Sequence, residues 1–110
     1  MIELKVFRNS DQTISGFELS GHANSGPHGH DLVCAAVSAV SFGSVNSIIQ
    51  LCQIEPEIEQ GTEGGFLKML LPEGMSDEAY NKAQTLLSGM LVTFQTIERD
   101  YNQYITIFEK

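Results

Sequence analysis

Residues 21–44 of this 110-residue chain are GHANSGPHGHDLVCAAVSAVSFGS. The first half of this stretch is broken by a proline and by glycines that include Gly26 and Gly29, which predicts a mobile, solvent-facing loop. Asp31 is a suitable N-cap residue, and a run of small and larger apolar residues follows it. We therefore expect a loop and then a helix over residues 31–52, whose small side chains allow close packing against a sheet or another helix.

Two segments upstream, residues 2–7 and 13–20, alternate apolar and polar residues and predict two strands. The residues between them, Asn-Ser-Asp-Gln, favour a turn. The two strands should form a hairpin whose second strand ends beside His22. The alternation also places Phe17 and Ile14 on opposite faces of that strand.

The chain after the first helix predicts two more strands, a second helix and a last strand. Residues 54–59 alternate apolar residues with glutamate, and Pro56 predicts an edge strand because proline cannot donate to a ladder. Residues 66–71 predict the fourth strand. Ser76 should cap a long helix that carries one apolar stripe, and residues 102–108 predict the last strand.

The element order is therefore ββαββαβ, which predicts an α+β fold with a mainly antiparallel sheet packed with two long helices. The length favours a single domain over residues 1–110, small enough that dimerisation would add stability. Six Lys and Arg against 14 Asp and Glu give a net charge of −8. That balance disfavours binding to nucleic acid and favours a basic protein or peptide as partner.

The sequence also predicts a cytoplasmic protein. The first residues mix charges and lack the apolar core of a secretory signal. The apolar stretch over residues 32–51 is interrupted by Ser and Asn, so we expect a packed helix and not a membrane span. Cys34 and Cys52, on one helix, would lie roughly 27 Å apart, so we expect two free thiols in a reducing compartment.

Cys34 and His22 are the candidate catalytic residues. A thiolate is the nucleophilic form of cysteine, and the free N–H groups and dipole of a helix N-terminus favour negative charge there. The same N–H groups are candidates for an oxyanion hole. The loop between His22 and Cys34 allows the two side chains to meet. The plainer interpretation is that Cys34 is a small core residue and His22 a turn residue.

Asp31 has three candidate roles, of which helix capping is the most favoured; the others are to orient His22 or to bind a substrate amine. His28 and His30 raise the alternative of a zinc site with Cys34. Their spacing matches no finger or ribbon pattern, so we expect no metal and no other cofactor.

A set of motifs resembles the ribosomal-processing cysteine protease family, Prp. The motifs are GHA at 21–23, Gly26, G-x-D-L-V-C-A-A-V-S at 29–38, FGSVN at 42–46 and LVTFQTIE at 91–98. The resemblance covers essentially the whole chain. It implies a bacterial, cytoplasmic, dimeric protease that removes the N-terminal extension of large-subunit ribosomal protein twenty-seven, cutting after Phe-Phe and before Ala, a step in ribosome assembly.

The resemblance also implies roles for single residues. Cys34 matches the family's nucleophile and His22 its general base, while Asp31 matches a motif position whose part in a triad stays open. The glycines of a mobile substrate loop are matched by Gly21, Gly26 and Gly29.

Three hypotheses follow. The first is a cysteine endopeptidase that acts on the N-terminal peptide of a ribosomal protein, with no direct contact to nucleic acid or membrane. The second is a non-enzymatic, ribosome-associated binding module. The third is a zinc-dependent hydrolase that uses the histidine-rich loop, which the resemblance weakens because His28 and His30 fall at positions that vary in the family.

Overall fold

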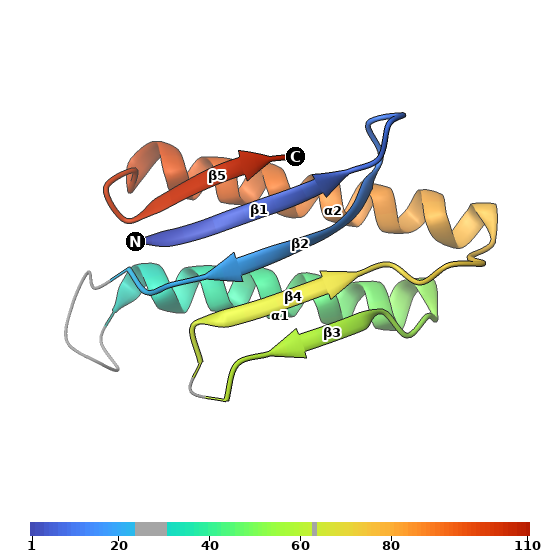
Figure 1. The fold of residues 1–110 in the computed structure, drawn as a ribbon, viewed down its shortest axis with the longest axis horizontal. Helices are drawn as coiled ribbons and strands as arrows, with labels where there is room; N and C mark the ends of the chain where they lie inside the picture. Colours follow the sequence, from blue (N-terminus) through green and yellow to red (C-terminus); the bar gives the residue numbers. More distant parts are fainter. Residues whose placement is uncertain (24–30, 63) are drawn as a thin grey trace.

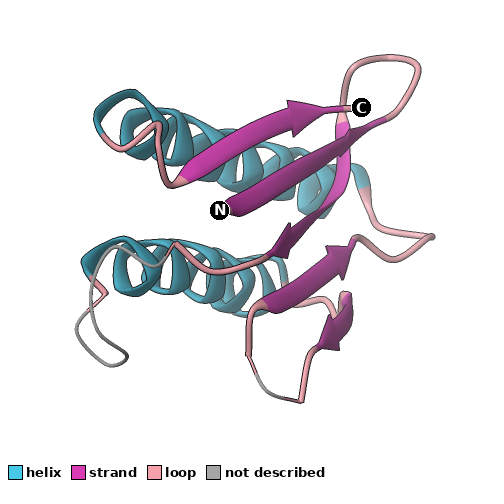
Figure 2. Cartoon of the chain, turned by 60° about the vertical axis from the view of Figure 1, so that its left-hand side comes forward, coloured by secondary structure: helices cyan, strands magenta, loops and turns pink. Residues whose placement is uncertain are grey.

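The computed structural model describes residues 1–23, 31–62 and 64–110, which form a five-stranded sheet with two helices on one face (Figures 1 and 2). The elements in chain order are β1 (Ile2–Arg8), β2 (Ile14–Ser20), α1 (Leu32–Cys52), β3 (Glu57–Gln60), β4 (Phe66–Leu70), α2 (Asp77–Asp100) and β5 (Ile105–Glu109). The predicted order ββαββαβ and the α+β class are confirmed.

The strands lie in the order β3-β4-β2-β1-β5, and the chain path explains where the site forms. Neighbouring strands are antiparallel except β1 and β5, which are parallel because α2 carries the chain from β4 to the far edge. The other helix, α1, leads from the end of β2 to the opposite edge strand, β3. The start of α1 therefore lies beside the end of β2 (Figure 1).

Both helices begin directly after the residues that the sequence predicted as caps. The Oδ1 atom of Asp31 accepts a hydrogen bond from the N–H of Cys34 (3.0 Å), and the Oγ atom of Ser76 accepts one from the N–H of Ala79 (3.1 Å). Each bond satisfies one of the donors that a helix start leaves unpaired. Between the helices and the sheet lies the core, whose largest fully buried apolar residues include Leu4, Phe17, Ile48, Met69, Leu87 and Phe94.

The α1 helix has one buried side and one exposed apolar side. Its length and apolarity would also suit a membrane span, and within the described residues it is the one helix of which this is true. Val37, Ser41 and Ile48 lie on the side that faces the core, as the prediction of a packed helix requires. On the other side, Leu32 is 79% exposed and Ile49 36%.

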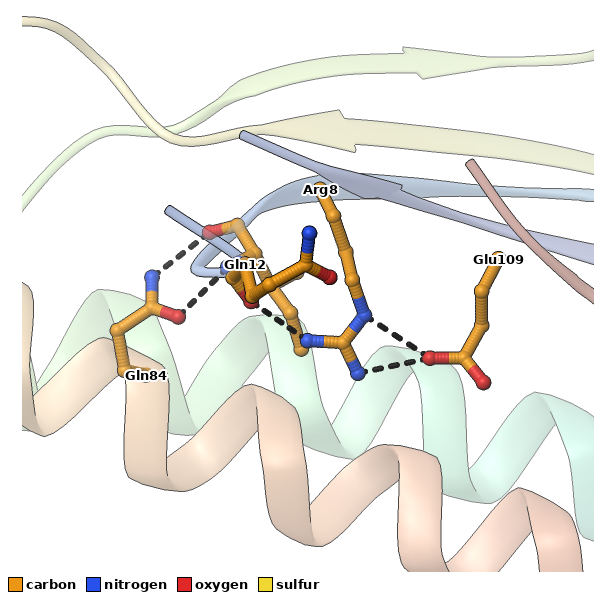
Figure 3. Close-up of polar contacts among 5 residues, drawn as sticks. Arg8, Gln12, Gln84 and Glu109 are labelled. Carbon is orange, nitrogen blue, oxygen red and sulfur yellow. Dashed lines mark hydrogen bonds and ion pairs between the residues drawn. The ribbon is translucent and has the colours of Figure 1, made fainter. Parts of the chain in front are cut away.

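The prediction that Ile14 faces away from Phe17 is wrong, because both side chains are buried in the core. The pairing of β1 with β2 shifts register just before the pair Arg8–Ile14, and such a bulge resets the alternation of the strand. The side-chain amide of Gln84 on α2 binds both the N–H and the C=O of Ile14, at 2.7 Å each. Figure 3 shows this contact beside the ion pair between Arg8 and Glu109.

Two strands, β3 and β5, begin three residues later than the sequence predicted. The edge strand β3 begins at Glu57, directly after Pro56, because proline has no N–H for the ladder. Its place at the edge of the sheet is confirmed. The last strand begins at Ile105, because the chain first makes a turn in which the N–H of Tyr104 donates to the carbonyl oxygen of Tyr101 (2.9 Å).

Candidate active site

The fold places Cys34 in the first turn of α1, where the sequence predicted it. Its N–H donates to Oδ1 of Asp31, and its side chain is half-buried. The other cysteine, Cys52, is the last residue of the same 21-residue helix and is buried. Both thiols are free, as predicted, and only Cys34 lies at the end of α1 that approaches β2.

His22 follows directly on the end of β2 and is held from the side by the turn between β3 and β4. The N–H of Gly21 donates to the carbonyl oxygen of Gly65 in that turn (2.9 Å). Gly21 has a φ of +94°, a left-handed conformation that glycine adopts without steric cost. The imidazole of His22 is exposed on this anchored backbone.

A backbone amide points at the sulfur of Cys34. The N–H of Ala23, the residue after His22, donates to Sγ of Cys34 at 3.3 Å, and Ala23 itself is buried. This contact joins the end of β2 to the start of α1 across the segment 24–30. A donor in this position stabilises negative charge on the sulfur.

Two of the N–H groups at the start of α1, which are candidates for an oxyanion hole, have partners within the chain. The N–H of Cys34 donates to the side chain of Asp31, and the N–H of Ala35 donates to its carbonyl oxygen (3.0 Å). Both donors are therefore engaged in the helix start. An oxyanion hole at the start of α1 stays a prediction.

Cys34 and His22 line one cavity of about 230 Å³. Its walls come from the end of β2, the first half of α1 and the β3–β4 turn. Gly21, which the sequence assigned to the site, lines it as well. Six apolar residues cover much of the wall: Ile2, Leu19, Val37, Phe42, Phe66 and Leu67. The cavity thus brings the predicted nucleophile and base to one apolar pocket.

Asp31 has the capping role that the sequence favoured. Its side chain accepts from the N–H of Cys34, and its φ and ψ of −83° and 103° are the extended conformation of an N-cap. The cap fixes the backbone that carries the sulfur. A further role of Asp31 in orienting His22 stays a prediction.

Four of the predicted loop residues, Gly26, His28, Gly29 and His30, lie outside the described residues. Within residues 1–23, 31–62 and 64–110, no group of three His, Cys, Asp or Glu side chains could hold a metal ion. The role of the two histidines and the expectation of no metal remain predictions.

The contribution of the β3–β4 turn to the cavity was missed by sequence reasoning. Gly61, Gly64, Gly65 and Phe66 all line the cavity, although the sequence indicated only a connecting turn there. The pair Gly64-Gly65, both at positive φ, was the one available signal. Two successive glycines mark a place where the backbone can approach another group closely.

Comparison with known proteins decides the family. Residues 1–106 match the family model of the cysteine protease Prp. The chain belongs to the Prp family of cysteine proteases. The ribosomal processing cysteine protease Prp of Bacillus subtilis is 46% identical over 107 residues, which are 97% of this chain and 96% of that protein. Its counterpart in Staphylococcus aureus is 40% identical over 97% of each chain.

Solved Prp structures share the fold over the full chain. The crystal structure of the S. aureus Prp with a covalently linked product peptide has a TM-score of 0.90 and 40% identity, with 100% of both chains covered. The S. aureus Prp with a substrate peptide has a TM-score of 0.83 and 38% identity, again over all of both chains. The predicted resemblance to the Prp family is confirmed.

Proposed function

We propose that this chain is a cysteine endopeptidase in which Cys34 is the nucleophile and His22 the general base. The observation that carries the proposal is that both side chains line the same cavity, with the N–H of Ala23 directed at the sulfur. Membership of a cysteine protease family supports it. Cys52 is the one other cysteine of the chain. It offers no alternative nucleophile, because it is buried at the far end of α1.

The reaction follows from this arrangement. His22 takes the proton from Sγ of Cys34, and the thiolate attacks the carbonyl carbon of the scissile peptide bond. The C–N bond then breaks as the imidazolium returns the proton to the leaving amine. A thioester remains on Cys34, and a water molecule activated by His22 hydrolyses it to release the second product.

The N–H of Ala23 supports the first step. A hydrogen bond from a backbone amide to sulfur is stronger when the sulfur is charged than when it is neutral. The donor is already in place at 3.3 Å, so no reorganisation is needed when the thiolate forms. The cap from Asp31 fixes Cys34 at the distance that this contact requires.

The proposed substrate is the N-terminal extension of large-subunit ribosomal protein twenty-seven, cut after Phe-Phe and before Ala. The names of the relatives, which are ribosomal processing proteases, support a ribosomal substrate. Apolar side chains such as Val37, Phe42 and Phe66 in the cavity wall suit an apolar cleavage segment. A net charge of −8 would attract the basic body of a ribosomal protein.

The proposed setting is the bacterial cytoplasm, with the protein acting in ribosome assembly as a homodimer. The free thiols of Cys34 and Cys52 support a reducing compartment. The exposed apolar side of α1, with Leu32 and Ile49 on it, supports association of two copies. We propose no metal or cofactor, and no direct contact with nucleic acid or membrane.

A peptide that contains Phe-Phe-Ala, followed by mass spectrometry, tests the activity. Wild type should cleave it once, after the second Phe, and Cys34→Ala should not. His22→Ala should lose about 10²- to 10⁴-fold in turnover, the contribution typical of a general base. The matched control is Cys52→Ala, which removes the other thiol and should cleave normally. Cleavage that persists in Cys34→Ala would rule the mechanism out.

A further inference from the structure

The β3–β4 turn touches the proposed base at Gly65. A methyl group built on Gly65 would lie 2.6 Å from Nε2 of His22, 3.0 Å from Cε1 and 3.3 Å from Cδ2. These three atoms form the outer end of the imidazole ring, so this end lies directly against the Cα of Gly65. Any side chain at residue 65 would occupy the space that the ring now fills.

The same residue also holds the backbone that leads into His22. The carbonyl oxygen of Gly65 accepts the hydrogen bond from the N–H of Gly21. Gly65 therefore holds His22 in two ways. Its carbonyl oxygen binds the backbone of the preceding residue, Gly21, and its Cα lies against the imidazole ring. Its φ of +76° turns the backbone so that both contacts are made by one residue.

We propose that Gly65 is a positioning residue for His22, and that the absence of a side chain at residue 65 sets the orientation of the imidazole towards Cys34. This inference rests on the proposed function of His22 as general base. A general base works only within hydrogen-bonding reach of its proton, and small displacements of a reacting group lower rates steeply. Gly65 would thus control activity without touching the substrate.

The exposure of His22 determines what a substitution at residue 65 would do. The atoms that a methyl group would meet belong to the far end of an exposed side chain and not to the backbone. The ring can rotate about its side-chain torsions to another staggered position at little cost to the fold. Gly65→Ala should therefore displace the base and leave the fold intact.

The chain offers a matched control in the neighbouring residue. Gly64 has a φ of +77°, against +76° for Gly65, and a methyl group on Gly64 would meet nothing within 4 Å. Alanine at either position carries the same strain of a left-handed backbone. The difference between Gly64→Ala and Gly65→Ala therefore isolates the contact with the imidazole.

The test compares these two variants in three measurements: turnover of the Phe-Phe-Ala peptide, thermal unfolding, and the NMR signals of the His22 ring, assigned by their loss in His22→Ala. Relative to Gly64→Ala, we expect Gly65→Ala to lower kcat about 10²-fold, as a misplacement of about 1 Å does. KM should change only a few-fold and the melting temperature should be equal. The ring signals of His22 should shift in Gly65→Ala only.

Equal turnover and unshifted His22 signals in the two variants would overturn the proposal. If wild type cleaves no peptide, the proposed function fails, and the NMR comparison alone decides whether Gly65 positions the ring. If Gly65→Ala does not fold, the variant is repeated in the His22→Ala background. Recovery of folding there supports the contact with the ring, and continued failure to fold contradicts it.

Discussion

Removal of the Asp31 cap should lower both the stability of α1 and the activity of Cys34. The bond from the N–H of Cys34 to Oδ1 of Asp31 is 3.0 Å long. Loss of such an N-cap costs about 1 kcal/mol of unfolding free energy. At roughly 2.1 cal/mol/K per residue, the unfolding entropy of a chain this size is about 0.23 kcal/mol/K, so Asp31→Ala should lower Tm by about 4 °C. Turnover should fall too, because the first turn that carries Sγ is loosened.

Ser76→Ala is the matched control for this experiment. Ser76 caps α2 with a bond of 3.1 Å to the N–H of Ala79, and none of these atoms lines the cavity. The control should lose a similar amount of stability and keep its turnover. Asp31→Asn should retain both, because Asn caps as well as Asp. Calorimetry and the peptide assay measure the two effects.

Two results would refute this reasoning. If Asp31→Ala melts at the wild-type temperature while Ser76→Ala does not, the cap at Asp31 contributes nothing to stability. If Asp31→Asn melts normally but loses turnover, the charge of Asp31 is needed for catalysis. The carboxylate would then act on His22, as in a triad.

Three further predictions concern the scaffold. Gln84→Ala should cost about 1–3 kcal/mol in urea unfolding, because it leaves the N–H and C=O of Ile14 without their side-chain partners; a loss below about 0.5 kcal/mol would contradict this. Hydrogen bonds from the hydroxyl and the N–H of Thr13 lower the pKa of Asp11 below its ordinary value of 3.8. The folded state therefore gains the full stabilisation from these bonds above pH 3.8, and loses it as the pH falls through the lowered pKa. In Thr13→Val an NMR titration should find the pKa of Asp11 raised, and an unchanged pKa would exclude the hydroxyl as its main cause. Phe94→Ala, at a fully buried site, should lower the free energy of unfolding by about 3–5 kcal/mol. A loss below about 0.5 kcal/mol, typical of a surface residue, would contradict the burial of Phe94 in the core.

The helices were predictable because their signals are local. Asp31 and Ser76 each place a side-chain acceptor three residues before a backbone donor, and both helices start directly after them. The apolar residues that follow Ser76 recur at the helical period, and a run of small and apolar residues follows Asp31. Cap and pattern together were sufficient to place Cys34 in the first turn of α1.

The errors arose where structure depends on how the strands pair. Strict alternation assigned Ile14 to the wrong face, because alternation cannot reveal the bulge that the pairing with β1 introduces. The pair Gly64-Gly65 signalled a close approach but did not indicate His22 as the neighbour, since the pairing of β4 with β2 is what brings Gly65 and His22 together. The pairing of strands distant in sequence is not encoded in either segment alone.

The central claim is that Cys34 carries the acyl group during peptide cleavage. The most direct test is the mass of the intact protein in an acid-quenched reaction with a Phe-Phe-Ala peptide, followed by digestion and fragmentation to locate the added mass. The mechanism predicts a transient species heavier by the N-terminal product less one water, attached at Cys34 and absent from Cys34→Ala. Peptide cleavage with no added mass at any time, or with the mass attached at Cys52, would contradict it.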